Sequence, residues 1–247
     1  MRKILIVLLL MSLHVMAGSI YATFDVEPTK SANLSLTSGG IIEYMGVDIG
    51  SHVKKGDTLL YLDNSEINAS LELAKVRLNL AKINAKYAKR SFERFEKVKN
   101  VIDEGEYDRY AANYERAKSQ VQEAHLSVKL KQTQLAKTIL KAPFDGIIYD
   151  KLAEVGDAVS GGIIKTLLKV QSDNEVKLLL HVDQKYWKSL QKGLLFTYSV
   201  DGDDKHYTGT VSKVYPTANA NNRKIIVEVP ANNILPGLFG EGEIEVQ

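Results

Sequence analysis

Residues 40–56, GIIEYMGVDIGSHVKKG, and residues 146–162, GIIYDKLAEVGDAVSGG, are two copies of one glycine-rich pattern at a constant offset of 106 residues. Glycine adopts positive φ or allows another backbone to approach closely, so each copy predicts short strands joined by tight turns. Each copy is too short to bury its own apolar side, and we expect the two to pack face to face as one β-sandwich. The glycines expected to shape it are Gly40, Gly50 and Gly56 in the first copy and Gly146, Gly156 and Gly162 in the second.

The segment between the copies has the composition and periodicity of long helices. Residues 65–140 contain one glycine and no proline, and their apolar residues recur at alternating steps of four and three from Ile67 to Phe95. A second series with this spacing runs from Tyr107 to Leu135, with a single interruption. Such a heptad seam predicts coiled-coil packing. A helical bundle has the same periodicity, but we prefer an antiparallel hairpin over residues 65–140 because the two copies of the repeat have to meet.

The reversal of the hairpin is expected a few residues before Glu106. Asp103 followed three residues later by Glu106 is a capping-box-like signature, so the second helix is predicted to begin there. Val98, Val101 and Ile102 gather apolar side chains at the end of a rod that has no core to bury them. An exposed apolar tip is typical of a docking surface. The alternative is that these residues only cap the hairpin's own end.

The C-terminal third consists of short strand-like runs separated by turns rich in Gly, Asn and Asp, with residues 186–190 as a short helix. Strands at such regular spacing point to a small closed barrel or sandwich. We expect a β-barrel domain over residues 171–247, with residues 23–38 supplying its first strand. The fold class is then mixed α and β with nested modules. The sandwich halves, residues 39–64 and 141–170, lie between the barrel segments and enclose the hairpin.

The start of the chain has the pattern of a secretory signal peptide. Two basic residues, an apolar stretch over residues 4–13 and a group of small residues follow one another. Cleavage fits after Ala17 or after Ala22; we prefer Ala22, which gives a leader of residues 1–22. An uncleaved anchor is the alternative, because the stretch up to Ala22 has about the 20 residues that just span a bilayer. Removal of the leader predicts a protein that works outside the cytoplasm.

Composition excludes several classes of protein. The 247 residues contain no cysteine, which removes disulfide scaffolds, zinc–thiolate sites, iron–sulfur clusters and thiol nucleophiles. Lys and Arg number 32 and Asp and Glu number 30, and the two signs balance once Arg2 and Lys3 of the leader are set aside. Charge therefore gives no reason to expect a nucleic-acid partner.

The sequence offers no motif for catalysis or for cofactor binding. The histidines beyond the leader, His52, His125, His181 and His206, show no metal-ligand spacing, and H-E-x-x-H does not occur. A phosphate-binding glycine loop and G-x-S-x-G do not occur either. The acidic residues of the helical segment lie beside Lys and Arg, where intrahelical pairing accounts for them. We expect no catalytic, cofactor or metal residues and no enzyme activity.

The ordered combination of these features resembles the periplasmic adaptor proteins, also called membrane fusion proteins of the HlyD family. Residues 39–63 and 141–170 look like the two halves of the family's split lipoyl domain, and residues 141–146, KAPFDG, are similar to its signature at the return from the hairpin. Residues 235–239, LPGLF, match in the C-terminal part. The resemblance implies a split lipoyl-like β-sandwich, an antiparallel coiled-coil hairpin and a C-terminal β-barrel, in a short form without the membrane-proximal domain.

The resemblance also implies a non-catalytic role in export. Such a protein bridges an inner-membrane transporter to a TolC-like outer-membrane channel, with the hairpin tip at the channel and the barrel at the transporter. A cleaved leader without a long anchor favours a transporter of the RND type over an ABC exporter or a type I secretion system. The protein is expected in the periplasm, associated with the inner membrane through its transporter. It is expected to form a homo-oligomer such as a hexameric ring, with no cofactor and no nucleic acid.

At the tip, many family members carry an Arg, a Leu four residues later and a Ser near the start of the second helix. Here Arg94 matches the Arg, Val98 occupies the Leu position and Asp103 occupies the Ser position. Asp caps a helix as Ser does, so the local fold is expected to survive, but the changed charge and shape call the family's usual docking mode into question. The resemblance assigns channel docking to Arg94, Val98, Val101, Ile102 and Asp103.

Two other classes of protein are alternatives to an adaptor. A covalently modified lipoyl or biotinyl carrier would place its Lys on the turn that joins the two halves. Here the hairpin replaces that turn, and no Asp-Lys-Ala or Met-Lys-Met tripeptide occurs. The second alternative is a purely structural coiled coil of the cell envelope, which would have neither a transporter nor a channel as partner.

Overall fold

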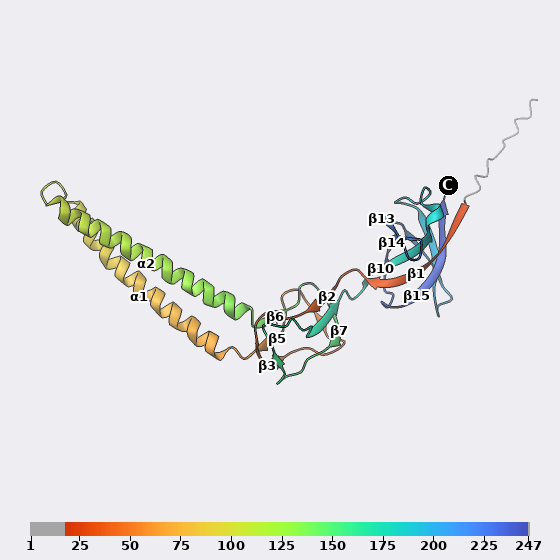
Figure 1. Cartoon of the computed structure of the whole chain (residues 1–247), viewed down its shortest axis with the longest axis horizontal. Coiled ribbons are helices and arrows are strands. Elements are labelled where there is room, and N and C mark those ends of the chain that lie inside the picture. The colour runs from red at the N-terminus through yellow and green to blue at the C-terminus, as the bar shows by residue number, and fades with distance from the viewer. Residues whose placement is uncertain (1–17, 247) are drawn as a thin grey trace, which may run out of the picture. The chain divides into compact units, whose positions relative to one another are not determined.

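The computed structural model describes residues 18–246, which fall into two compact units. One unit combines the described residues up to Ser31 with those from Gln171 onward, and the other comprises residues 32–170. Of the leader predicted over residues 1–22, the first 17 lie outside the described residues. The elements of both units are labelled in Figure 1.

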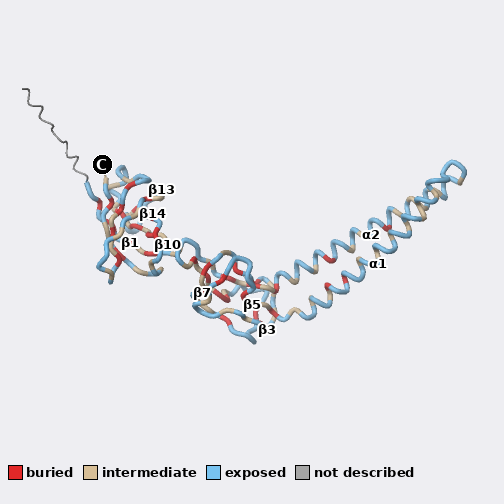
Figure 2. The backbone as a smooth tube through the Cα atoms, turned by 180° about the vertical axis from the view of Figure 1, so that it is seen from behind, coloured by how far each residue is buried: buried red, intermediate tan, exposed pale blue. Residues whose placement is uncertain are grey.

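Two long helices, α1 (Ser65–Glu96) and α2 (Glu104–Ala136), lie side by side and run in opposite directions (Figure 1). Most of their surface is exposed, and the buried positions are scattered along the pair (Figure 2). The predicted helical pair is confirmed. The residues buried between the helices belong to the predicted seams and are Leu71, Ala74 and Val128, with Leu78 and Leu135 packed against them.

The two glycine-rich copies form two four-stranded sheets, and each sheet takes strands from both copies. One sheet has the order β2-β9-β7-β4 and the other the order β6-β5-β3-β8. Strands made before the hairpin are therefore hydrogen-bonded to strands made after it. The bounds are β2 (Ser31–Leu34), β3 (Gly40–Met45), β4 (His52–Val53), β5 (Thr58–Leu62), β6 (Ile139–Lys141), β7 (Gly146–Lys151), β8 (Ala158–Val159) and β9 (Leu168–Gln171).

The pairing between the copies follows the offset of the repeat. His52 of the first copy pairs with Ile147 of the second. Ala158 lies 106 residues after His52, and Ile41 lies 106 residues before Ile147. These two equivalent residues pair with each other in the same way. The expectation that the copies pack together is therefore confirmed, and they do so by a reciprocal exchange of short strands. The fully buried core of this unit includes Ile42, Leu60, Leu62, Ile148, Leu168 and Val170.

The other unit is built on a seven-stranded sheet in the order β12-β11-β15-β1-β10-β14-β13. The sequence predicted a closed barrel, but β12 and β13 are two edges, so the sheet is a half-barrel. Pro216 and a register shift between Val214 and Ala218 lie in β13, and both features end regular pairing at a sheet edge. The bounds are β1 (Gly18–Pro28), β10 (Glu175–Asp183), β11 (Leu195–Val200), β12 (His206–Thr210), β13 (Lys213–Asn219), β14 (Lys224–Asn232) and β15 (Phe239–Val246).

The first strand of the half-barrel starts earlier than the predicted boundary at residue 23. β1 begins at Gly18, and Ile20 and Ala22 are buried in the core of the half-barrel. Gly18, Ser19 and Ala22, which resembled the end of a leader, are thus strand residues, and Ala22 faces the core. Residues 32–38 belong to the other unit, so the prediction that residues 23–38 as a whole form a barrel strand is wrong.

The helical segment also ends before the predicted boundary at residue 140. α2 ends at Ala136, and β6 begins at Ile139. The N–H of Leu62 donates to the carbonyl oxygen of Thr138 at 3.0 Å, which returns the chain to the sheet directly after the helix.

Candidate functional site

The tip of the hairpin is the turn that joins α1 to α2. After α1 ends, the N–H of Val98 donates to the carbonyl oxygen of Phe95 at 3.1 Å, and the N–H of Val101 donates to that of Val98 at 3.0 Å. Asp103 is the N-cap of α2, and its carboxylate accepts a hydrogen bond from the N–H of Glu106 at 3.2 Å. The predicted start of the second helix is confirmed.

Apolar side chains at the tip face solvent. Val101 is 84% exposed and Val98 is 43% exposed, while Ile102 is half-buried. These residues and Asp103 lie within one turn of chain, and Arg94 lies one helical turn before Val98. Exposed apolar groups gathered in this way mark an interaction surface.

Arg94 lies on the exposed side of the last turns of α1. Its Nη2 donates to Ser91 Oγ at 3.3 Å, and among residues 18–246 it makes no ion pair. A guanidinium with unused donors can bind a carboxylate or a main-chain carbonyl of a partner. Arg94 lines a surface groove of about 460 Å³ together with Tyr87, Arg90, Ser91, Glu93 and Lys97.

The two helix ends carry different charge near the tip. The last turns of α1 and the residues just after it are mainly basic, whereas the first turn of α2 begins with Glu104 and Glu106. Lys89 Nζ lies 3.5 Å from Glu93 Oε1, an exposed pair that contributes little to stability. A protein docked on the tip would meet a basic surface on α1 and an acidic one on α2.

Five aromatic rings lie just below the tip, between the two helices. Phe95 stacks on Tyr110 with 3.8 Å between ring centroids, and Phe92 lies 5.8 Å from Tyr107 and 5.7 Å from Tyr114. Such aromatic pairs add about 0.5–1.5 kcal/mol each beyond the area they bury. These residues belong to the predicted heptad seams, and their contacts hold the outer ends of the helices in register.

A second row of apolar residues on α1 was not predicted from the sequence. Its residues follow the same alternating steps of three and four as the buried seam, two positions further along the chain. This repeated spacing is the sequence signal that could have revealed the row. Within the described residues no other element covers the row. Because its last member, Tyr87, also lines the Arg94 groove, the row extends the candidate surface along the helix. The row consists of Leu73, Val76, Leu80, Ile83 and Tyr87, which are between 44% and 65% exposed.

Three of the six predicted turn glycines adopt a backbone conformation that favours glycine. The φ angle is +87° at Gly50, +93° at Gly56 and +94° at Gly156. Gly162 lies outside this region of φ, and its N–H donates to Ser160 Oγ at 3.3 Å. The second copy therefore closes with a different turn from the first.

The remaining predicted glycines lie where the two copies meet. Gly40 begins β3 and pairs with Val159, and Gly146 begins β7 and pairs with Val53. The backbones of the two copies also approach each other closely at Gly39, a position that was not predicted. A Cβ added to Gly39 would lie 2.9 Å from the backbone nitrogen of Gly161.

Electrostatics gives no sign of a reactive centre in the described part of the chain. Between residues 18 and 246, no group of three or more His, Asp or Glu side chains is placed to hold a metal ion. The N–H of Ile49, followed by Lys151, lowers the pKa of Asp48, and the hydroxyl of Tyr207 lowers the pKa of Asp203. These carboxylates fix turns, because Asp48 accepts from the N–H of Ile49 and Asp203 from the N–H of Lys205. Over the same residues, no helix combines the length and apolar character needed to cross a membrane.

Residues 30–164 match the family model of the CzcB-like barrel-sandwich hybrid domain. The match includes both glycine-rich copies and the hairpin between them. This chain belongs to the CzcB-like family. Its barrel-sandwich hybrid corresponds to the two four-stranded sheets, with α1 and α2 inserted between the halves.

Two relatives of this CzcB-like chain show how far the likeness extends. YdhJ of Escherichia coli K12, an uncharacterized protein, is 26% identical over 215 residues, which cover 82% of this chain and 73% of YdhJ. The cobalt-zinc-cadmium resistance protein CzcB of Cupriavidus metallidurans is 30% identical over 146 residues, which cover 53% of this chain but only 26% of CzcB. The chain thus spans most of one relative and about a quarter of the other.

The fold of this CzcB-like protein is similar to that of MacA from Actinobacillus actinomycetemcomitans. The crystal structure of MacA matches with a TM-score of 0.73 at 18% identity, and the match covers 94% of this chain and 79% of MacA. The resemblance to adaptor proteins drawn from the sequence is confirmed at the level of family and fold.

Proposed function

We propose that this CzcB-like protein is the periplasmic adaptor subunit of a tripartite efflux system. In this role the hairpin tip docks on a TolC-like outer-membrane channel, and the half-barrel contacts an inner-membrane transporter. The protein acts by bridging and sealing and catalyses no reaction. The observation that carries the proposal is the exposed turn around Val101, with Arg94 beside it, at the end of a coiled coil inserted into a barrel-sandwich hybrid.

The finer proposal concerns the partners. We favour an RND-type transporter over an ABC exporter or a type I secretion system, because residues 1–22 have the pattern predicted for a cleavable leader. Several copies of the chain, such as a hexameric ring, surround the export path. The likeness to the cation efflux system protein CzcB of Alcaligenes sp., which is 30% identical over 146 residues, supports a role in efflux.

Site-specific photo-cross-linking tests the docking role of the tip. A photoreactive amino acid is placed at Val101, and at Leu126 in a matched control, because both side chains are exposed and Leu126 lies on α2, outside the Arg94 groove and the exposed row of α1. Irradiation of cells followed by mass spectrometry is expected to identify an outer-membrane channel at Val101 and not at Leu126. Equal capture at both positions, or no channel at Val101, would overturn the docking proposal.

Co-purification from solubilised membranes tests the transporter class. An RND protein is expected among the partners that remain bound after gentle cross-linking. Recovery of an ABC transporter instead would reject the RND preference, and it would leave the adaptor role intact. Recovery of no transporter would favour a structural coiled coil.

A further inference from the structure

The half-barrel presents an exposed turn that bears lysines and a tryptophan. This turn is the 3₁₀ helix η1 (Gln184–Tyr186) with the residues that follow it, and the Asp183 carboxylate caps it by accepting from the N–H of Lys185. Tyr186 and Leu190 pack against the half-barrel core. Trp187 points away from that core and is 63% exposed. The turn is therefore held firmly while its large ring faces solvent.

Cations surround the exposed ring. Lys188 Nζ lies 5.5 Å from the Trp187 ring centroid, and Lys185 Nζ lies 4.8 Å from that of Tyr186. Lys192 follows on the same loop. Within residues 18–246 none of these three lysines makes an ion pair, so their charge is available to a ligand.

Two further cations are brought beside the turn by the neighbouring strand. The N–H of Gln184 donates to the carbonyl oxygen of Arg223 at 3.0 Å, and Asp183 is the register partner of Lys224. Asp183, an acidic residue at the start of the turn, uses its carboxylate to cap the turn. Together these side chains form a surface that we call the basic turn, which consists of Lys185, Trp187, Lys188, Lys192, Arg223 and Lys224.

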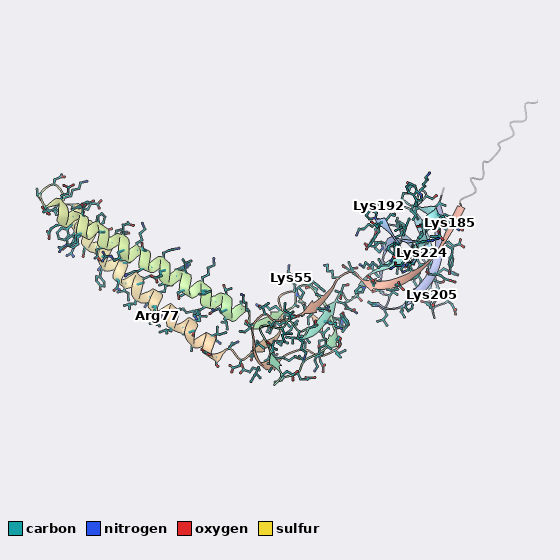
Figure 3. The ribbon with its side chains drawn as sticks, viewed as in Figure 1. Lys55, Arg77, Lys185, Lys192, Lys205 and Lys224 are labelled. Atoms are coloured by element: carbon teal, nitrogen blue, oxygen red, sulfur yellow. The ribbon has the colours of Figure 1, made fainter. Side chains whose placement is uncertain are left out.

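The basic turn lies at the end of the half-barrel where β1 begins. β1 pairs antiparallel with β10, with Thr23 opposite His181, so the end of β10 lies level with the start of β1. Gly18 pairs with Val246 at this same end. Figure 3 shows the labelled Lys185 and Lys192 at this end and Lys205 toward the opposite one.

The opposite end of the same sheet carries the other sign of charge. The loop after β11 contains Asp201, Asp203 and Asp204, and the N–H of Asp201 donates to the carbonyl oxygen of Phe239 at 3.0 Å. The net charge of the half-barrel therefore differs between its two ends, with Glu245, the register partner of Ser19, as an acidic residue at the basic end.

We propose that the basic turn binds the surface of an anionic phospholipid bilayer. Trp rings partition to the boundary between headgroups and acyl chains, where one face is apolar and one edge is wet. Lys side chains extend their charged ends to lipid phosphates while their methylene stems lie along apolar surface. Each cation near an anionic membrane contributes about 1 kcal/mol of attraction. The half-barrel thereby rests on the membrane by its basic end, a contact that does not depend on the hairpin tip.

The single tryptophan makes the proposal directly measurable, because all tryptophan fluorescence comes from Trp187. The full chain is purified, its N-terminus is established by intact mass, and vesicles are added. A blue shift of the emission is expected with vesicles that contain phosphatidylglycerol, and little change with phosphatidylcholine alone. Brominated lipids are expected to quench the emission most when bromine lies close to the headgroups.

Charge-matched variants separate this surface from general electrostatic attraction. The triple variant Lys185→Gln, Lys188→Gln, Lys192→Gln is expected to weaken binding to anionic vesicles on the order of 100-fold, since each lysine contributes about fivefold. The control Lys30→Gln, Lys55→Gln, Lys205→Gln removes the same charge from exposed positions elsewhere and is expected to bind as the parent does. A leader retained in the purified chain is common to all variants and cannot produce the difference between them.

Three results would overturn the proposal. The first is an unchanged emission with anionic vesicles, and the second is an equal loss of binding in both triple variants. The third is a shift that requires a transporter in the vesicle and does not occur with lipid alone, which would make the basic turn a protein-docking surface. Channel capture at Val101 is measured separately, so failure of the lipid contact and failure of the adaptor role are distinguishable.

Discussion

The backbone N–H of Gly50 donates a hydrogen bond to the carbonyl oxygen of Ile148 at 2.8 Å. The equivalent bond one repeat further on joins the N–H of Gly156 to the carbonyl oxygen of Ile42 at 2.9 Å. Gly50 and Gly156 are thus each hydrogen-bonded to a core strand of the other copy. These two equivalent hydrogen bonds join the sandwich half that precedes the hairpin to the half that follows it.

Substitution at these turns should be costly because of backbone conformation. Gly50 has a φ of +87°, where a Cβ costs about 1–2 kcal/mol, although an added Cβ would meet no atom within 4 Å. Gly50→Ala is expected to lower the free energy of unfolding by that amount, as measured by urea denaturation. Gly162→Ala is the matched control and should be nearly neutral, because its φ is not positive and its Cβ would lie 3.9 Å from Ser160 Oγ. Equal destabilisation by both substitutions would contradict the conformational explanation.

Loss of the helix cap should loosen the tip. Asp103→Ala removes the acceptor for the N–H of Glu106 and is expected to cost about 1 kcal/mol of local stability. Hydrogen exchange of the Glu106 and Tyr107 amides measures this directly. Asp103→Ser keeps a capping oxygen and should restore protection, which would not happen if the carboxylate acted only through its charge.

Charge placed at the tip should abolish channel docking without harming the fold. Val101→Asp changes a side chain that is 84% exposed, so the free energy of unfolding should change by less than about 0.5 kcal/mol. Export and channel capture should nevertheless be lost. Val128→Asp is the contrasting variant: it buries a carboxylate in the helix seam and should destabilise the protein by more than about 2 kcal/mol. Retained export in a well-folded Val101→Asp protein would remove the tip from the docking surface.

Acid should weaken the sandwich partly through Asp48. Its pKa is lowered by the N–H of Ile49 and then by Lys151, whose Nζ lies 3.3 Å from Asp48 Oδ1 and belongs to the other glycine-rich copy. Because the folded-state pKa lies below the ordinary value of 3.8, this stabilisation is present above that pH and is lost as the pH falls through the folded-state pKa. Asp48→Asn should therefore flatten the acid limb of the stability curve, measured by urea unfolding from neutral pH downward. Asp204→Asn, an exposed control, should keep the parent's slope.

The mature N-terminus is expected at Gly18. Cleavage after Ala22 would remove residues 18–22, which pair with β15 and include the buried Ile20 and Ala22. Cleavage after Ala17 leaves β1 whole and follows a small-residue site. Intact mass of the periplasmic protein measures this, and a chain that began at Thr23 would show that the sheet tolerates loss of half its central strand.

The hairpin and the repeat were predictable because each has a strict sequence period. Heptad spacing placed the seam that contains Phe92 and Tyr114, and the constant offset predicted that the copies meet. Local patterns did not separate leader from strand around Ala22, because small residues suit both a cleavage site and a crowded β-sheet core. The turn at Gly162 also departed from its counterpart, since equal spacing does not impose equal φ.

The surface features needed the three-dimensional structure. Residues 186–190 were expected only as a short helix between strands, and the structure adds that Tyr186 faces the core while Trp187 faces solvent. The acceptor of the Arg94 guanidinium, Ser91, likewise depends on side-chain geometry. Burial in the protein's own core produces a regular hydrophobic pattern, but contact with a partner does not. The positions of exposed side chains such as these are therefore hard to predict from the sequence.

The exchange of short strands between the two copies sets an order of folding. β3 cannot complete its pairing until β8 has been made, about a hundred residues later. The helices need only local contacts and form quickly, and by closing on each other they bring the ends of β5 and β6 together. Until then the first copy carries unpaired strand edges, which invite aggregation. During folding, early closure of the coiled coil thus shortens the time for which those strand edges are exposed.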